Sequence, residues 1–168
     1  MLEYISRYFD ITVFYFNPNI SPKEEYEKRV NEVKRLISEM PSCTEVKFIE
    51  GRYEPSEFFE AAKGLENAPE GGERCLKCFE LRLSEAARCA ADIGAEYVCT
   101  TLTISPLKNA DNLNRIGEEA AKKYGVKWLP SDFKKKNGYK RSIELSKEYD
   151  LFRQNYCGCV FSKRDSNV

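Results

Sequence analysis

The sequence has no histidine among its 168 residues and contains only two methionines and one tryptophan. Without imidazole, the chain lacks the side chain most often used for proton transfer near neutral pH and the commonest protein ligand of metal ions. Histidine-based catalytic triads and histidine-ligated zinc sites are therefore excluded. A metal ion in this protein has to be held by sulfur, with carboxylate oxygen as the other type of ligand.

Long apolar runs and an excess of charge are also missing. No segment approaches the roughly 18 to 20 apolar residues of a membrane span, and no basic-then-apolar leader opens the chain. The 27 basic and 27 acidic residues cancel, so the total charge does not indicate a nucleic-acid partner. We therefore expect a cytoplasmic protein without a membrane partner, in which thiols stay reduced, and a single domain over residues 1–168.

Hydrophobic periodicity alternates between short β-rich runs and helical stripes, which is typical of an α/β fold. A helical segment comes first, so the strand that usually opens a doubly wound sheet is missing. Ser21 is expected to cap the first long helix, and Pro22 to stand in its first turn. The predicted strands are residues 11–16, 46–49, 96–100 and 126–129, and the main predicted helices are residues 22–40, 53–63, 74–93, 113–124 and 139–149.

Four of the seven cysteines stand in two close pairs, Cys75 with Cys78 and Cys157 with Cys159. The first pair lies at a predicted helix start, where its spacing puts both sulfurs on one face, near backbone N–H groups that favour thiolates. The second pair flanks Gly158, whose conformational freedom suits a strained, easily reduced disulfide or chelation of one metal ion.

Spacing alone leaves three interpretations of these pairs open: a structural zinc site, an iron–sulfur or redox centre, and cysteines of the core. A zinc ribbon usually has about 15 to 20 residues between its pairs, whereas 78 residues separate Cys78 from Cys157. Cys43, Cys89 and Cys99 are expected in the core. Cys89 lies about 16 Å along the predicted helix from Cys78, too far to share a small cluster.

Two loops that follow predicted strands carry side chains suited to a ligand, at the end of an α/β sheet where sites usually lie. Amide and hydroxyl groups beside a lysine at a helix start suit phosphate or another anion. The alternative is that these are ordinary turn and cap residues. The candidate side chains are Asn17, Asn19, Thr101, Ser105, Lys108 and Asn109.

A basic segment precedes the last predicted helix, with Lys134, Lys135 and Lys136 followed by Tyr139, Lys140 and Arg141. Basic charge interleaved with an aromatic ring suits phosphate contacts and base stacking on RNA. The alternative is a run of solvated lysines.

Together these motifs resemble the QueH-type epoxyqueuosine reductases, from about Tyr8 to Phe161. The resemblance rests on FYFNPNI-x-P with Glu25, Tyr26 and Arg29, on ERC-x-x-CF with Arg82, on TTL-x-x-SP-x-KN, and on GY, Leu145–Glu148 and RQNYCGCVFS.

The resemblance implies a Rossmann-like fold of the adenine nucleotide α-hydrolase (HUP) type with flanking helices. It also implies reduction of epoxyqueuosine to queuosine in tRNA, the last step of queuosine synthesis, with an unidentified electron donor. Cys75 and Cys78 would be ligands of a 4Fe-4S cluster, and Cys157 and Cys159 a redox-active pair or the holders of an additional iron. Tyr156, Tyr139 and a thiol are the candidate proton donors.

The chain departs from the family pattern at its start. Family members carry two adjacent cysteines at the end of the first strand, and this sequence has no Cys-Cys, so it retains two of four expected cluster ligands. We expect an N-terminally shortened sequence or a variant that has lost the site. The alternative functions are a non-catalytic, zinc-stabilised tRNA-binding domain and an inactive truncated homologue.

Overall fold

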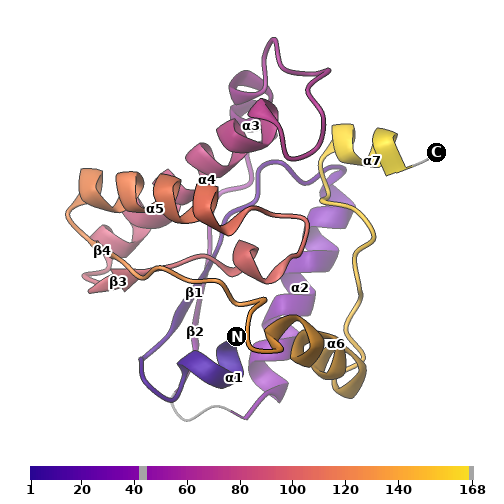
Figure 1. The fold of residues 1–168 in the computed structure, drawn as a ribbon. Coiled ribbons are helices and arrows are strands. Elements are labelled where there is room, and N and C mark those ends of the chain that lie inside the picture. Colours follow the sequence, from indigo (N-terminus) through magenta and orange to yellow (C-terminus); the bar gives the residue numbers. More distant parts are fainter. Residues whose placement is uncertain (42–44, 167–168) are drawn as a thin grey trace. The chain divides into compact units, whose positions relative to one another are not determined.

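The computed structural model describes residues 1–41 and 45–166, with side chains up to residue 163, and the expected core residue Cys43 lies outside the described residues. The chain divides into two compact units: unit 1 is Met1–Pro55 with Lys140–Val168, and unit 2 is Ser56–Tyr139. Each unit contains one pair of short parallel strands with helices beside it (Figure 1). The predicted α/β class is therefore confirmed.

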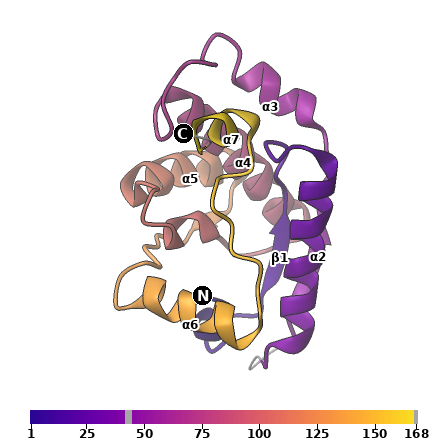
Figure 2. The ribbon, with the colours of Figure 1, turned by 90° about the vertical axis from the view of Figure 1, so that its right-hand side faces the viewer.

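In unit 1, the parallel strands are joined by the helix that covers them. Thr12 pairs with Lys47 and Tyr15 with Glu50, and the crossover that a parallel pair needs is α2, which runs alongside β1 (Figure 2). Tyr26 and Val30 on one face of α2 pack with Ile20 to form the core. The elements are α1 (Leu2–Ile5), β1 (Thr12–Tyr15), α2 (Lys23–Glu39), β2 (Lys47–Glu50), most of α6 (Gly138–Glu148) and α7 (Val160–Ser166).

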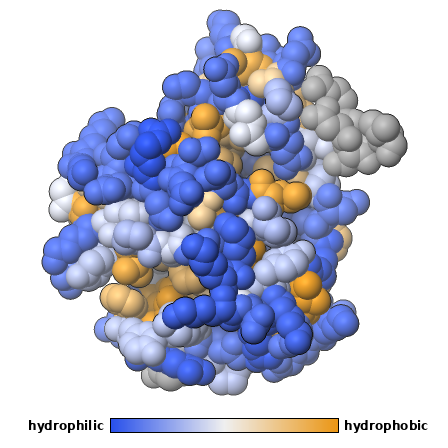
Figure 3. All heavy atoms as spheres, in the orientation of Figure 1, coloured by the Kyte–Doolittle hydropathy of each residue, from blue (hydrophilic) through white to orange (hydrophobic). Residues whose placement is uncertain are grey.

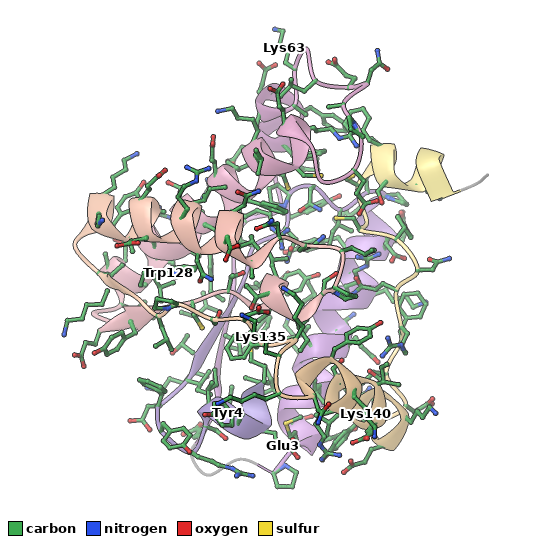
Figure 4. The ribbon with its side chains drawn as sticks, in the orientation of Figure 1. Glu3, Tyr4, Lys63, Trp128, Lys135 and Lys140 are labelled. Carbon is green, nitrogen blue, oxygen red and sulfur yellow. The ribbon has the colours of Figure 1, made fainter. Side chains whose placement is uncertain are left out.

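In unit 2, the core lies between α4 and α5. Gly117 on α5 leaves room for the indole of Trp128, which is labelled in Figure 4, because a Cβ atom at position 117 would lie 2.3 Å from the ring. The buried cluster consists of Phe79, Leu83, Ala87, Leu113, Ile116 and Ala120. The elements are nearly all of α3 (Pro55–Ala61), α4 (Glu73–Asp92), β3 (Tyr97–Val98), the 3-10 helix η1 (Thr101–Ile104), α5 (Ala110–Tyr124) and β4 (Lys127–Trp128).

Hydrophilic side chains cover most of the face shown in Figure 3. Within residues 1–41 and 45–166, no helix combines the length and the apolar character needed to cross a membrane.

The long helices were predicted closely, but several local details were wrong. Pro22, not Ser21, is the N-cap of α2, and no side chain caps that end. The loop expected after residue 100 begins with η1, because Thr100 accepts a hydrogen bond from the N–H of Leu102 and starts a tight turn. Strands β3 and β4 have two residues each, shorter than predicted. Helix α7 was not predicted.

Two cysteines outside the close pairs lie in apolar surroundings, as expected. Cys89 is buried on α4, and Cys99 is half-buried after β3. Burial raises the pKa of the Cys89 thiol, and it raises the pKa of Cys99 to about 11. Both thiols therefore stay protonated at neutral pH and are poor nucleophiles and metal ligands.

Two leucines of unit 2 test where the core lies. Leu113 is fully buried, while Leu107 is 77% exposed. We expect Leu113→Ala to lower the free energy of unfolding by about 3 kcal/mol, because it removes packed methyl groups and leaves a cavity. Leu107→Ala should change it by less than about 0.5 kcal/mol. Urea unfolding followed by circular dichroism measures both, and equal losses would contradict the assignment of the core.

The raised pKa of Cys99 predicts a loss of stability at high pH. A thiol that ionises at about 11 in the folded chain, against 9.0 as its ordinary value, stabilises the fold fully below pH 9. That contribution is lost as the pH rises through 11, because the unfolded chain loses its proton first. The unfolding free energy should therefore fall more steeply between pH 8.5 and 10.5 in the unmodified chain than in Cys99→Ala. Parallel curves would show that Cys99 is not the cause.

Candidate functional site

Cys75 and Cys78 lie in the first two turns of α4, which begins after the N-cap Gly72. Cys75 is half-buried and Cys78 is buried. The N–H of Gly71 donates a hydrogen bond to Cys75 Sγ at 3.2 Å. The predicted helix start is confirmed, and it provides two thiols close together at the end of a helix that favours negative charge.

Arg74 holds the loop that precedes this pair. Its side chain is only 1% exposed, and Nη1 donates to the carbonyl oxygen of Glu66 at 3.0 Å and to that of Ala68. Gly71 lies in the same loop. Arg74 therefore also helps to position the N–H of Gly71, which donates to Cys75 Sγ. Sequence analysis included Arg74 in a motif but gave it no role.

The predicted anion-binding side chains of unit 2 make local contacts. Ser105 Oγ accepts from the N–H of Leu107 at 3.3 Å, and Asn109 Oδ1 accepts from the N–H of Asn112 at 2.9 Å, at the N-cap of α5. These are the turn and cap roles that formed the alternative interpretation. Thr101 is exposed at the start of η1.

Lys108 connects this loop to the cysteine turn. Its Nζ lies 5.9 Å from the centre of the Phe79 ring, and Phe79 directly follows Cys78 on α4. Within unit 2 a lysine of the loop therefore contacts α4 one residue beyond the Cys75/Cys78 turn.

In unit 1, the Cys157–Gly158–Cys159 segment, here called the CGC loop, is held mainly through its backbone. The N–H of Ser21 donates to the carbonyl of Gly158 at 3.0 Å, and the N–H of Cys157 donates to Ser162 Oγ at 3.2 Å. The N–H of Ser162 in turn donates to Cys159 Sγ at 3.3 Å, at the start of α7. Cys157 is half-buried, and Cys159 is 6% exposed.

A buried ion pair on α2 contacts the CGC loop. Arg29 is 4% exposed. Its Nε pairs with Glu25 Oε1 at 2.7 Å, and its Nη1 donates to the carbonyl of Cys157 at 3.1 Å and to Gln154 Oε1 at 2.8 Å. The centre of the guanidinium lies 5.3 Å from the centre of the Tyr156 ring. Sequence analysis gave Arg29 no role, although its place beside Tyr26 and Val30 on the apolar stripe of α2 was a usable signal.

The predicted asparagine loop lies next to the CGC loop. The carbonyl of Asn17 accepts from the N–H of Ile20 at 3.2 Å, which closes a turn. Asn19 is 2% exposed, and within the described residues its Oδ1 is buried without a hydrogen bond. A Cβ atom on Gly158 would lie 3.0 Å from Ile20 Cγ1. The turn is thus part of the interior of unit 1, beside the cysteine pair.

The basic segment is largely compensated by carboxylates. Arg141 pairs with Glu3 at 2.5 Å, Glu144 at 3.5 Å and Glu148 at 3.7 Å. The hydrogen bond from Arg141 lowers the pKa of Glu3, which keeps the carboxylate charged.

Lys134 and Lys135 both pair with Asp132. Four members of the predicted RNA-binding group are exposed: Lys135, Lys136, Tyr139 and Lys140. Lys135 and Lys140 are labelled in Figure 4.

Within the part of the chain that the structure describes, no three Cys, Asp or Glu side chains gather closely enough to hold a metal ion. Cys75 and Cys78 fit half of a four-thiolate set in the type of donor, their proximity and the helix end that they share. The two cysteine pairs belong to different units: Cys75 and Cys78 to unit 2, Cys157 and Cys159 to unit 1.

Comparison with known proteins matches these motifs as a set. The family model described as "Epoxyqueuosine reductase QueH" matches residues 1–165. Relatives with the same name share 46% identity over 99% of this chain in Streptococcus pyogenes serotype M1 and in Staphylococcus epidermidis. A relative from Thermotoga maritima shares 38% identity over 91% of this chain.

The chain spans only part of these relatives. It covers 66% of the Streptococcus protein, 72% of the Staphylococcus protein and 79% of the Thermotoga protein. The match nevertheless extends over both cysteine pairs and nearly the whole of the present sequence. The chain belongs to the epoxyqueuosine reductase QueH family.

Proposed function

We propose that this chain reduces epoxyqueuosine in tRNA to queuosine. The observation that carries the proposal is the family match over residues 1–165, which includes both cysteine pairs. The relatives that match are named epoxyqueuosine reductases, that is, oxidoreductases. The proposal includes a cytoplasmic protein in which the thiols stay reduced, a single functional domain over residues 1–168, and the adenine nucleotide α-hydrolase type of fold.

The reaction removes one oxygen atom from the substrate. Two electrons and two protons convert the epoxide to an alkene and water. Oxidation of the Cys157 and Cys159 thiols to one disulfide releases two electrons and two protons, so this pair balances the reaction by itself. An external reductant then has to return two electrons and two protons to the disulfide.

The proposed cofactor is a 4Fe-4S cluster with Cys75 and Cys78 among its ligands. When bound, such a cluster supplies one-electron transfer. The chain's own contribution is to keep both thiols at the start of α4, with Cys75 Sγ accepting the N–H of Gly71. The buried Arg74 keeps that N–H in place. An additional iron at Cys157 and Cys159 remains part of the proposal as the alternative to a disulfide.

Proposed substrate contacts differ in the support that they receive. Tyr139, Lys140 and Thr101 are exposed and suit phosphate contact or base stacking. Tyr156 directly precedes the CGC loop, and we keep it as a candidate proton donor together with Tyr139. Ser105, Asn109 and Arg141 have local structural roles, so their contact with tRNA requires those roles to change. Asn17 and Asn19 belong to the turn beside the CGC loop, and Asn19 is 2% exposed. Lys108 contributes positive charge beside the Cys75/Cys78 turn.

Cysteine variants test the proposed roles in the chain as it stands. After anaerobic purification, we expect Cys75→Ala or Cys78→Ala to lose iron, acid-labile sulfide and conversion of epoxyqueuosine-tRNA. Cys157→Ala should keep most of the iron and lower turnover by about 100-fold or more. Cys89→Ala is the matched control, because this buried thiol lies on the same helix without a proposed ligand role.

Two results would contradict the proposal. Normal turnover in a Cys157/Cys159 double variant would remove the redox role of the pair. Colourless protein that contains one zinc ion and no iron would favour the zinc-stabilised tRNA-binding domain instead.

A further inference from the structure

We propose that Arg29, together with Glu25, is a positioning residue for the CGC loop. In this role Arg29 does not touch the substrate. It holds the carbonyl of Cys157, and through it the conformation in which the two sulfurs of the loop react. The inference rests on the proposed function, because it assumes that the Cys157/Cys159 pair takes part in the reduction.

The segment that carries the cysteines needs support from elsewhere in the chain. Residues 151–159 contain no helix or strand, so no regular hydrogen-bond ladder fixes their backbone. Arg29 Nη1 supplies two contacts across 125 and 128 residues of sequence, to Gln154 Oε1 and to the Cys157 carbonyl. Both acceptors share one nitrogen, so one side chain fixes two points of the segment just before it enters the CGC loop.

Glu25 fixes the direction of the guanidinium. Its Oε1 lies 2.7 Å from Arg29 Nε, one turn earlier on α2, and its side chain is 17% exposed. A planar guanidinium bound at Nε cannot rotate away from its other contacts without breaking the ion pair. The side chain that holds the Cys157 carbonyl is therefore fixed in direction by a neighbour on the same helix, α2.

Gly158 is fitted against the same group. Its φ of +103° lies in the region that favours glycine. A Cβ atom at this position would lie 2.8 Å from Arg29 Nη1 and 3.1 Å from Cζ. The residue between the two cysteines is thus packed on the guanidinium face, which gives a second, independent contact between Arg29 and the loop.

Stability alone is a poor reason for this arrangement. Burial of a guanidinium costs free energy that an ion pair often fails to recover, and an apolar residue on a helix stripe avoids the cost. Within the described residues, Nη2 of Arg29 is also buried without a hydrogen bond. A charged group with an unmet donor, aimed at the backbone of a reactive pair, is better explained by the geometry that it imposes.

The proposal makes a specific statement about Cys159. In the held loop, Cys159 is 6% exposed and its sulfur accepts the N–H of Ser162. When Arg29 no longer holds the Cys157 carbonyl, the loop loosens and Cys159 becomes accessible. The same loosening lowers the population of the reactive arrangement, so kcat falls while substrate binding stays nearly constant.

Arg29→Lys is the main test variant. Lysine keeps the charge but offers one nitrogen, which cannot serve Glu25, Gln154 and the Cys157 carbonyl at once. In the anaerobic full chain we expect alkylation of Cys159 by iodoacetamide, read by peptide mass spectrometry, to become roughly tenfold faster, and kcat to fall roughly tenfold or more with KM within about twofold.

Arg35→Lys is the matched control on the same helix. Arg35 pairs with Glu32 and Glu39 and donates to the carbonyls of Tyr149 and Asp150, outside the CGC loop. It should leave both the alkylation rate of Cys159 and kcat unchanged. Gly158→Ala is the second variant: it leaves Arg29 in place but displaces the loop from it, and it should reproduce both effects of Arg29→Lys.

Three results overturn the proposal. The first is an unchanged Cys159 alkylation rate in both Arg29→Lys and Gly158→Ala. The second is an equal acceleration at the buried Cys89 of unit 2, which would mean general loss of structure. The third is a normal kcat despite faster alkylation. If the unmodified chain does not convert epoxyqueuosine-tRNA, the proposed function fails, and the alkylation rates still decide whether Arg29 holds the loop.

Discussion

Burying a guanidinium group far from water is costly unless its donors find acceptors, and this chain does it beside both cysteine pairs. Arg74 binds the carbonyls of the loop that leads to Cys75, and Arg29 binds the carbonyl of Cys157. Backbone carbonyls are acceptors that stay neutral in a protein at any pH. Each arginine therefore sets a main-chain path and adds a nearby positive charge. The backbone next to both cysteine pairs is held by these two contacts.

The sequence predicted the long helices well because their signal is local. Helix α2 carries its core residues at the spacing of a helix turn, and α5 ends at Gly125, whose positive φ of 72° suits a helix end. Strand ends were overestimated, since an apolar run shows that a segment is buried but not how far its hydrogen bonds extend. Helix α7 was missed because its cap is the sulfur of Cys159, a residue type that seldom has this role.

The site was predictable to a different extent. Both cysteine pairs are evident in the sequence from their spacing, and the structure confirms the helix start at Cys75 and Cys78. Asn109 and Ser105 were ambiguous for a physical reason: amide and hydroxyl groups that bind an anion are the same groups that cap helices and close turns. The contact of Arg29 with Cys157 was not predictable from one sequence, because it joins residues 128 positions apart and depends on the packing of the whole unit.

The N–H of Ser162 that points at Cys159 has one more consequence. A sulfur that enters a disulfide is a weaker acceptor for that N–H than a thiolate is, or turns away from it. The opening turn of α7 then has one stabilising bond fewer, worth about 1 kcal/mol for an ordinary hydrogen bond. Oxidation of the Cys159 thiol is therefore coupled to opening of the first turn of α7. Amide exchange in α7 would report the oxidation state of this sulfur.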